Sequence, residues 1–339
     1  MTTDRALRVA AGPASLPPSR SGWPTTSMPS RWPLLSRPMR GSRRERWKPA
    51  SNPVNRAVAF FVLLLALAAT PAVAQAHSRT GGYQNMAHEV ARDYESPYPL
   101  VHGIPMVDYG SFRARNPVTT AQYGLANWTL WVLHHERDRL RRARRAADWL
   151  VATQRKTGQW LYRFAYRSPG TTMELPVPWA SALAQGQAIS LLRRLYFHTH
   201  RRQYLRAARR ALAPLGRSVA RGGLLRWRRG EIVFEEYPTE RRSLPLNGHL
   251  QTLIGLYDLS DLSPTARRWF RRGVRSAAGI LPDYDAGGGR SLYSLVNLSG
   301  FPPFLADDGY HSEHVEELRL LNRLSPHRAF RRYIARWSS

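Results

Sequence analysis

The sequence predicts a mainly α-helical fold, an incomplete α/α toroid with small β-hairpins at one rim. Apolar residues recur at helical spacing over most of the chain after residue 117, and the predicted helices come in consecutive pairs joined by short loops or hairpins. No cysteine is present, so an apolar core must stabilise the fold. Paired helices that curl around an axis form a toroid, whose loops at one rim would make a cleft for an extended substrate. An open helical solenoid is the alternative architecture.

Eight helices account for most of the chain beyond residue 117. They are Thr119–His134, Leu140–Gln154, Trp179–Phe197, Arg201–Leu215, Leu250–Leu259, Pro264–Gly279, Gly309–Leu324 and Pro326–Trp337. Pro178 and Pro264 lie where a helix can start, because the first turn tolerates proline. Asp308 could cap the helix that follows it.

Three short β segments interrupt the helices. Gln159–Tyr166 alternates like a strand. Leu224–Tyr237 is predicted to form a hairpin that turns at Arg229-Gly230, and Tyr284–Leu295 one that turns at Gly287–Gly289.

The N-terminal part of the chain does not resemble a folded domain. Residues 1–53 are rich in Pro, Ser and Arg without an apolar period, which predicts a disordered extension, or a stretch outside the translated protein if Val54 is the true start. Residues 54–76 combine a basic residue, an apolar run and small residues near the C-terminal end of the segment, which is typical of a signal peptide. A retained membrane anchor is the alternative, since the run nearly spans a bilayer. Residues 77–339 are then the toroid domain of an exported protein of the cell envelope or the extracellular space.

The charge of the chain points to an anionic partner. The formal net charge is +28, and nearly every basic residue is arginine. A basic surface favours nucleic acid, anionic lipid or an acidic glycan. Export argues against nucleic acid, which leaves anionic lipid and an acidic glycan as partners. No metal is predicted, because His311 and His314 at a helix start favour a capping or supporting role over metal binding.

The strongest chemical signals lie in turns rather than on amphipathic helix faces. They are Phe234–Thr239 at the end of a hairpin, Gly289–Tyr293 after the glycine turn, and Ala306–His311 before a helix. A glutamate buried among aromatic residues has a raised pKa and can act as a base beside a sugar carboxyl group, while a tyrosine delivers a proton from the other face. In an extended segment Glu235 and Tyr237 share one face, which favours Glu235 over its neighbour as the base.

Four blocks, in their order and spacing, resemble the C-terminal catalytic domain of the D-glucuronyl C5-epimerase family. They are Pro178–Ser190; Glu235–Thr239 with Leu246–His249 and Leu253–Leu259; Leu281–Asp285 with Ser291–Leu295; and Gly309–His311 with Glu316–Leu318 and Tyr333–Trp337. The resemblance implies a helical toroid and a cofactor-free reaction. That reaction converts D-glucuronate to L-iduronate residues, or makes the equivalent inversion at C5, in an acidic polysaccharide.

The resemblance also implies a catalytic set of one glutamate and three tyrosines. By motif these fall on Glu236, Tyr237, Tyr293 and Tyr310. The hypothesis is that Glu236 and Tyr310 lie on opposite faces of the sugar ring and exchange the C5 proton. The other two tyrosines would orient the sugar and stabilise the carbanion-like intermediate. Predicted substrate contacts are Gln185, Asn247, Arg290, Glu235 and His311.

The chain departs from the family in its N-terminal part. The animal enzymes carry a β-rich part before the helical domain, whereas residues 77–178 here look mostly helical. A homodimer whose second copy completes the substrate groove could compensate. Two other functions stay open: a polysaccharide lyase, which abstracts the same proton and then expels the C4 oxygen, and a non-catalytic glycan-binding module.

Overall fold

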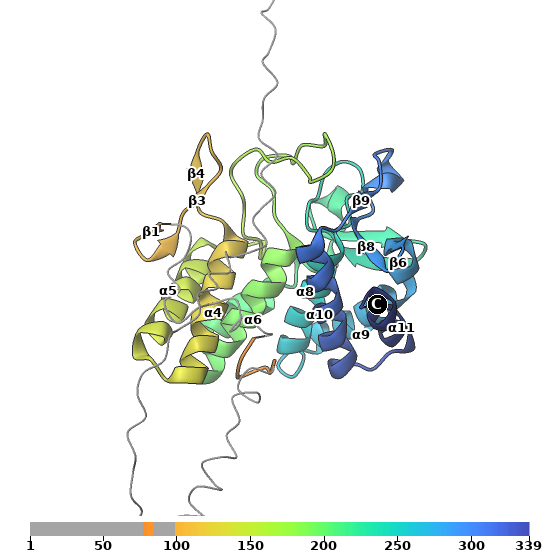
Figure 1. The fold of residues 1–339 in the computed structure, drawn as a ribbon. Helices are drawn as coiled ribbons and strands as arrows, with labels where there is room; N and C mark the ends of the chain where they lie inside the picture. The colour runs from red at the N-terminus through yellow and green to blue at the C-terminus, as the bar shows by residue number, and fades with distance from the viewer. Residues whose placement is uncertain (1–76, 84–98, 339) are drawn as a thin grey trace, which may run out of the picture.

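The fold is known from a computed structural model that describes residues 77–83 and 99–338 (Figure 1). The predicted extension over 1–53 and the export segment over 54–76 therefore lie outside the described residues. In the part of the chain that is described, no helix combines the length and the apolar character needed to cross a membrane.

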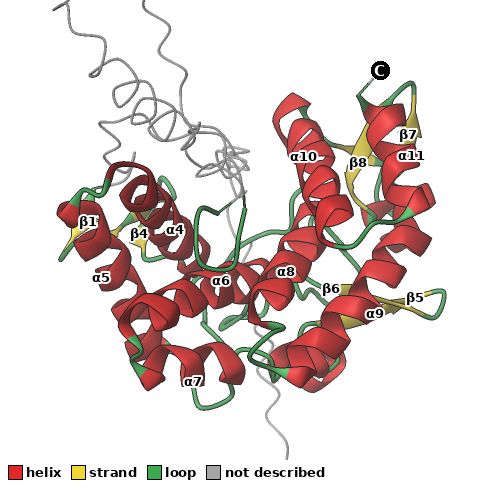
Figure 2. Cartoon of the chain, turned by 90° about the horizontal axis from the view of Figure 1, so that it is seen from below, coloured by secondary structure: helices red, strands yellow, loops and turns green. Residues whose placement is uncertain are grey.

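The described residues form eight α-helices arranged in two layers. They are α4 (Pro117–His134), α5 (Arg137–Thr153), α6 (Ala182–Thr199), α7 (Arg202–Arg210), α8 (Leu246–Leu259), α9 (Pro264–Ile280), α10 (Asp308–Leu324) and α11 (Arg328–Trp337). The inner helices α4, α6, α8 and α10 each pack against the next inner helix, and α5, α7, α9 and α11 each cover their own partner from outside. Figure 2 shows these pairs as an open arc, which is the predicted incomplete α/α toroid.

The inner helices α6 and α8 touch backbone to backbone. A Cβ placed on Gly255 would lie 2.2 Å from the carbonyl oxygen of Gly186, and one on Gly186 would lie 2.7 Å from the Cα of Thr252. Real Cβ atoms do not come this close to another atom, so a side chain at either glycine would push the helices apart. The α6–α8 crossing is therefore set by two residues that lack a side chain.

Polar residues cap several helices, and one cap differs from the prediction. Ser181 accepts a hydrogen bond from the N–H of Ala184, so α6 begins after Pro178 rather than at it. Asp307, not Asp308, caps α10, where its carboxylate accepts from the N–H of Tyr310 at 2.8 Å. Asp308 is the first residue of that helix, where a negative charge favours the helix dipole.

Small sheets lie between the helix pairs. Four strands of two residues each form two hairpins before α4: β1 (Leu100–Val101), β2 (Ile104–Pro105), β3 (Val107–Asp108) and β4 (Arg113–Ala114). The predicted hairpins are present as β5 (Leu225–Arg228) with β6 (Glu231–Phe234), and as β7 (Asp285–Gly287) with β8 (Arg290–Ser294). A third strand, β9 (Phe304–Leu305), pairs with β8 and was not predicted.

The strand predicted over Gln159–Tyr166 is wrong. Within this segment Tyr162 forms an isolated antiparallel bridge to Trp179, and no continuous strand is present. The alternation of aromatic residues has another cause, since these rings pack together at the rim of the toroid.

A short N-terminal segment, residues 77–83, is tied to the far ends of α6 and α8. The guanidinium of Arg194 in α6 donates to Asp258 in α8 at 2.6 Å and to backbone carbonyls of this segment. The imidazole of His77 contacts the other Asp258 oxygen at 2.8 Å. The side chains of all three residues are fully buried, so the charges are compensated within the protein.

Candidate active site

An aromatic cluster, separate from the main core, lies where the hairpin loops meet the first turns of the inner helices. Its buried rings are Tyr162, Trp179, Tyr237 and Tyr293, and the half-buried rings of Phe164, Tyr166, Phe304 and Tyr310 pack against them. In Figure 1 the connecting loops and the sheet of β8 and β9 lie together beyond the upper ends of the helices. The cluster brings together three predicted tyrosines that are far apart in sequence.

Glu236 is held in a bend directly after strand β6. The backbone N–H of Phe234 donates to Nδ1 of His249 in α8, which ties the end of the strand to that helix. The bend is formed by Glu236 and Tyr237, and the Glu236 side chain packs against Gly248 in the first turn of α8. A Cβ on Gly248 would lie 2.6 Å from Oε2 of Glu236, so only glycine leaves room for the carboxylate.

The carboxyl group of Glu236 is buried and has no cationic partner in the described ranges. Its Oε2 makes no hydrogen bond there, and no ion pair involves it. Burial raises the pKa of Glu236 to about 8, a hydrogen bond from Tyr237 opposes the rise, and the charge of Glu235 adds to it. A carboxyl group with a pKa near neutrality can both accept and return a proton.

Three tyrosines extend from Glu236 to the start of α10. The hydroxyl oxygens of Tyr237 and Tyr293 lie 3.5 Å apart. The Tyr293 ring meets the Tyr310 ring edge to face, with 4.6 Å between centroids. Burial raises the pKa of each of the three phenols, and the charge of Glu236 raises it further. All three therefore stay protonated near neutral pH and are suited to donate hydrogen bonds or a proton.

A stack of aromatic rings forms one wall beside these tyrosines. Tyr162 and Trp179 lie face to face with centroids 3.8 Å apart, and Tyr166 lies 5.9 Å from both Trp179 and Tyr237. Burial raises the pKa of Tyr166 to about 12, with a further contribution from Glu236. Tyr166 was not predicted as a site residue, although the spacing Tyr162, Phe164, Tyr166 already placed three rings on one face.

Glu235 points away from this cluster, into the protein. Its Oε2 accepts from Nε of Arg226 at 3.1 Å, and its Oε1 accepts from the N–H of Leu244 at 3.0 Å. The expectation that Glu235 and Tyr237 share a face assumed an extended segment, but β6 ends at Phe234 and the bend changes the alternation. The paired carboxylate is thus Glu235, and the unpaired one beside the tyrosines is Glu236.

Two of the predicted substrate contacts, Gln185 and Asn247, differ in whether the side chain has a polar atom free to bind a ligand. The amide of Gln185 is fully engaged, since Nε2 donates to the carbonyls of Gly158 and Ala211 and Oε1 accepts from the N–H of Trp160. Asn247 is buried in the first turn of α8, and its Oδ1 has no hydrogen-bond partner among the described residues. Asn247 directly precedes Gly248, on which the Glu236 side chain packs. The free acceptor of Asn247 is therefore in the same turn of α8 that contacts Glu236.

Arg290 at the start of β8 and His311 in the first turn of α10 are both held by other residues. Nη1 of Arg290 pairs with Asp308 at 2.7 Å, and Nη2 donates to the carbonyl of Ala306 at 3.0 Å. Nδ1 of His311 accepts from the N–H of Ser291, so its Nε2 donates to the carbonyl of Trp337 at 3.0 Å. These contacts fix the position of β8 relative to α10 and α11.

A second buried carboxyl group, not predicted from the sequence, lies on α10. Oε1 of Glu317 accepts from Nε2 of Gln251 at 2.8 Å, and the Gln251 oxygen accepts from the Tyr83 hydroxyl at 2.6 Å. Burial raises the pKa of Glu317, and the charges of Glu313 and Glu236 add to the rise. Among the described residues, no group of three or more His, Asp or Glu side chains could hold a metal ion.

The family model for the D-glucuronyl C5-epimerase C-terminus matches residues 154–339, more than half of the chain. The chain belongs to this family. The matched range begins after α5 and includes Glu236, Tyr237, Tyr293 and Tyr310.

Two curated relatives match this epimerase-family chain. It is 36% identical over 207 residues to the D-glucuronyl C5-epimerase of Caenorhabditis elegans, which covers 57% of the chain and 33% of the relative. It is 28% identical over 168 residues to an uncharacterized protein of Methanocaldococcus jannaschii, which covers 48% of the chain and 50% of the relative. The chain thus spans a third to a half of the length of these relatives.

Two solved structures are similar at low identity. A family 76 glycoside hydrolase from a bovine Bacteroides thetaiotaomicron strain gives a TM-score of 0.41 at 16% identity, covering 66% of this chain and 44% of that one. A UGL variant with dGlcA-Glc-Rha-Glc gives 0.43 at 15% identity, covering 65% and 60%. Both TM-scores are below 0.5.

Proposed function

We propose that this protein is a uronyl C5-epimerase that converts D-glucuronate to L-iduronate residues, or makes the equivalent inversion, in an acidic polysaccharide. The observation that supports it most is the unpaired, buried Glu236 carboxyl group beside the Tyr237, Tyr293 and Tyr310 phenols. The family membership of the matched range agrees with it. The export segment predicted over 54–76 would bring the protein to such a polysaccharide outside the cytoplasm.

In the proposed reaction Glu236 is the base and Tyr310 is the acid. The Glu236 carboxylate takes the C5 proton, and the C–H electron pair moves onto the substrate carboxylate to give an enolate-like intermediate. The Tyr310 hydroxyl then gives its proton to C5 from the opposite face, which inverts the carbon. Exchange with solvent returns the proton from Glu236 and reprotonates the Tyr310 phenolate. The raised pKa of Tyr310 fits the role of donor, because this phenol is protonated before the step.

The remaining groups orient the sugar and stabilise the intermediate. The Tyr237 and Tyr293 hydroxyls can donate hydrogen bonds to the enolate oxygens, where negative charge develops. The stack of Tyr162, Trp179 and Tyr166 offers aromatic surface to the apolar face of a sugar ring. The free Oδ1 of Asn247 can accept from a sugar hydroxyl.

The deciding experiment is solvent exchange at C5. The protein is incubated in heavy water with heparosan and with other uronate polymers, and deuterium at C5 is measured together with the ratio of epimers. We expect incorporation and inversion without new ultraviolet absorbance. Absorbance from an unsaturated uronate would instead identify a lyase, and absence of exchange on every polymer would identify a non-catalytic glycan-binding module.

Two substitutions locate the reaction. Glu236→Gln and Tyr310→Phe should each lower exchange by about 10²–10⁴-fold, because each removes a group that moves a proton. The circular dichroism spectrum and the unfolding temperature should show that both variants remain folded. If both variants exchange at near-normal rates, the assignment of these two residues is wrong.

A further inference from the structure

A second groove, distinct from the aromatic cluster, lies on the outside of the toroid. It has a volume of about 1050 Å³ and runs between the outer helices α7 and α9, bounded by the short helices η1 (Pro214–Gly216) and η2 (Val219–Arg221) and by strand β5. Its lining residues include none of the residues of the Glu236 site. The inner helices α6 and α8, which carry Gln185 and Asn247, pack behind α7 and α9.

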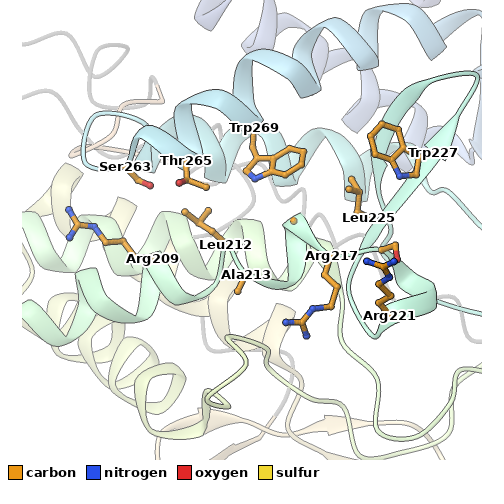
Figure 3. A pocket seen from close by; sticks show the side chains of 12 residues that line it. Arg209, Leu212, Ala213, Arg217, Arg221, Leu225, Trp227, Ser263, Thr265 and Trp269 are labelled. Atoms are coloured by element: carbon orange, nitrogen blue, oxygen red, sulfur yellow. The ribbon is translucent and has the colours of Figure 1, made fainter.

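The groove is lined by arginines and tryptophans. Figure 3 shows Trp227 and Trp269 along one side of the groove and, across from them, Leu212 and Ala213 between Arg209 and Arg217, with Arg221 opposite Trp227. No acidic residue is among the twelve that line it. The combination of cationic side chains, exposed indole surface and no negative charge is suited to an anionic ligand with apolar faces.

No ion pair within the described residues compensates the charges of the groove arginines. In the described ranges Arg217 and Arg221 are exposed, and their side chains make neither a hydrogen bond nor an ion pair. Arg209 donates to the Leu262 carbonyl at 2.8 Å, which fixes the head group but leaves its charge uncompensated. The exposed part of the charge is therefore available to a ligand.

Trp227 is unusually exposed for its type. Its side chain is 44% accessible on the outer face of β5, with the guanidinium of Arg272 stacked 4.8 Å from its ring centroid. The exposed indole and the Arg272 guanidinium together present an apolar ring face beside cationic groups. The six-membered faces of sugars carry C–H groups that stack on such a ring, and their carboxylates reach the flanking arginines.

We propose that this outer groove binds a second stretch of the same acidic polysaccharide, away from the reacting residue. The choice of ligand class rests on the proposed function, whereas the existence of an anionic-sugar site rests on the groove itself. A polymer held at the groove raises the local concentration of its other residues near the Glu236 site. Short oligosaccharides that fill only the Glu236 site gain nothing from the groove.

Binding without turnover tests the groove directly. The affinity of the protein for heparosan polymer is measured by calorimetry at fixed salt, for the parent and for three variants. Replacing Arg217 and Arg221 together by Gln should weaken binding about tenfold. Replacing Trp227 by Ala should weaken it about fivefold without changing the net charge.

The matched control removes the same charge elsewhere. Arg137 at the start of α5 and Arg331 in α11 are exposed, and in the described part of the chain their side chains make no hydrogen bond or ion pair. Their double replacement by Gln should weaken binding by no more than about twofold, the effect of net charge alone. If both double variants weaken binding equally, the groove is not a site and the proposal fails.

A second probe separates sugar recognition from charge. Polyglutamate carries carboxylates but no sugar rings, so Trp227→Ala should leave its binding unchanged while weakening that of heparosan. Equal effects on the two polymers, or none on heparosan, would overturn the aromatic part of the proposal.

Kinetics then distinguish this proposal from the proposed function. The groove variants should raise KM for the polymer with kcat unchanged, and should leave exchange on a short oligosaccharide as in the parent. If no polymer is epimerised but the groove variants still lose heparosan binding, the proposed function fails and the groove stands. If exchange occurs but polymer and oligosaccharide kinetics are insensitive to the groove variants, the proposed function stands and the groove fails.

Discussion

Helix α8 joins two buried carboxyl groups with opposite surroundings. At its last turn Asp258 is paired with Arg194 and His77, and although burial acts to raise its pKa, these partners hold the pKa below the usual range. At its first turn Glu236 packs on Gly248 without a cation, and burial raises its pKa. Burial is nearly complete at both sites, so the partners alone account for the difference.

The difference distinguishes a carboxylate that stabilises the fold from a carboxyl group that can exchange a proton. A paired carboxylate stabilises the fold and cannot readily change its proton. An unpaired carboxyl group destabilises the fold when it ionises, and for that reason exchanges a proton near neutral pH. The two ends of one helix should therefore respond in opposite ways to pH and to neutral substitutions.

The largest expected effect is the pH dependence that Glu236 imposes on stability. Its folded-state pKa of about 8 lies above the ordinary value of 4.5, so its contribution is fully present below pH 4.5 and is lost as pH rises to 8. Relative to Glu236→Gln, which stays neutral, the parent should lose up to about 5 kcal/mol of unfolding free energy across this window. Denaturant unfolding of both proteins between pH 4.5 and 8 measures the difference. A constant difference would show that Glu236 titrates normally.

Asp258→Asn, at the last turn of α8, should lower the free energy of unfolding by about 3–5 kcal/mol, because it leaves Arg194 buried without its counter-charge. Denaturant unfolding at pH 7 measures the loss. The control is Glu316→Gln, which breaks an ion pair with Arg319 in which both side chains are exposed, by 47% and 43%. That change should cost less than about 1 kcal/mol. Equal losses in the two variants would contradict a structural role confined to the buried pair.

Alanine substitutions at two glycines of α8 should affect stability and activity to different degrees. Gly255→Ala drives a Cβ into the backbone of α6, and Gly248→Ala drives one into the Glu236 side chain. We expect the first to cost about 3 kcal/mol of stability and the second about 1–2 kcal/mol. Exchange at C5 should fall more in Gly248→Ala, because the carboxyl group is displaced. Thermal unfolding and deuterium incorporation measured on both variants check this order, and a reversed order would refute it.

The smallest effect is expected from the hydroxyl of Tyr293. Its contact with the Tyr237 hydroxyl is long at 3.5 Å, so Tyr293→Phe should change stability by less than about 1 kcal/mol. Exchange should fall about tenfold, since one donor to the intermediate is lost. Tyr284→Phe is the control: its buried hydroxyl donates to the Leu244 carbonyl at 2.9 Å, so it should lose stability and keep exchange. Normal exchange in Tyr293→Phe would remove this residue from the proposed site.

The helices were predictable because their periodicity follows from which face is buried. The start of α8 was missed, since Asn247 and Gly248 are turn-forming residues by propensity. In the structure they lie in the first turn of α8, where Gly248 leaves room for the Glu236 side chain. Tertiary packing outweighs local preference there, and one sequence without its fold does not show it.

The candidate site was predictable in composition but not in geometry. Strand alternation favoured Glu235, and only the family resemblance moved the prediction to Glu236. The bend after Phe234 that makes the difference depends on His249, fifteen positions along the chain. Tyr166 and Glu317 were missed because their roles come from contacts with distant elements; Glu317 lies in the block Glu316–Leu318, but nothing local marks it as a buried carboxyl group.

The contact between Gly186 and Gly255 has a consequence for the choice of substrate. Because the two inner helices already touch through their backbones, they cannot approach further, and side chains do not set their separation. Where α6 and α8 border the opening at the rim, their separation is therefore fixed. Under the proposed function, selection among sugars of different size is left to Tyr166, Tyr293 and Tyr310, which lie outside the α6–α8 pair. Changing specificity is thus a matter of remodelling the segments that carry these tyrosines while α6 and α8 keep their separation.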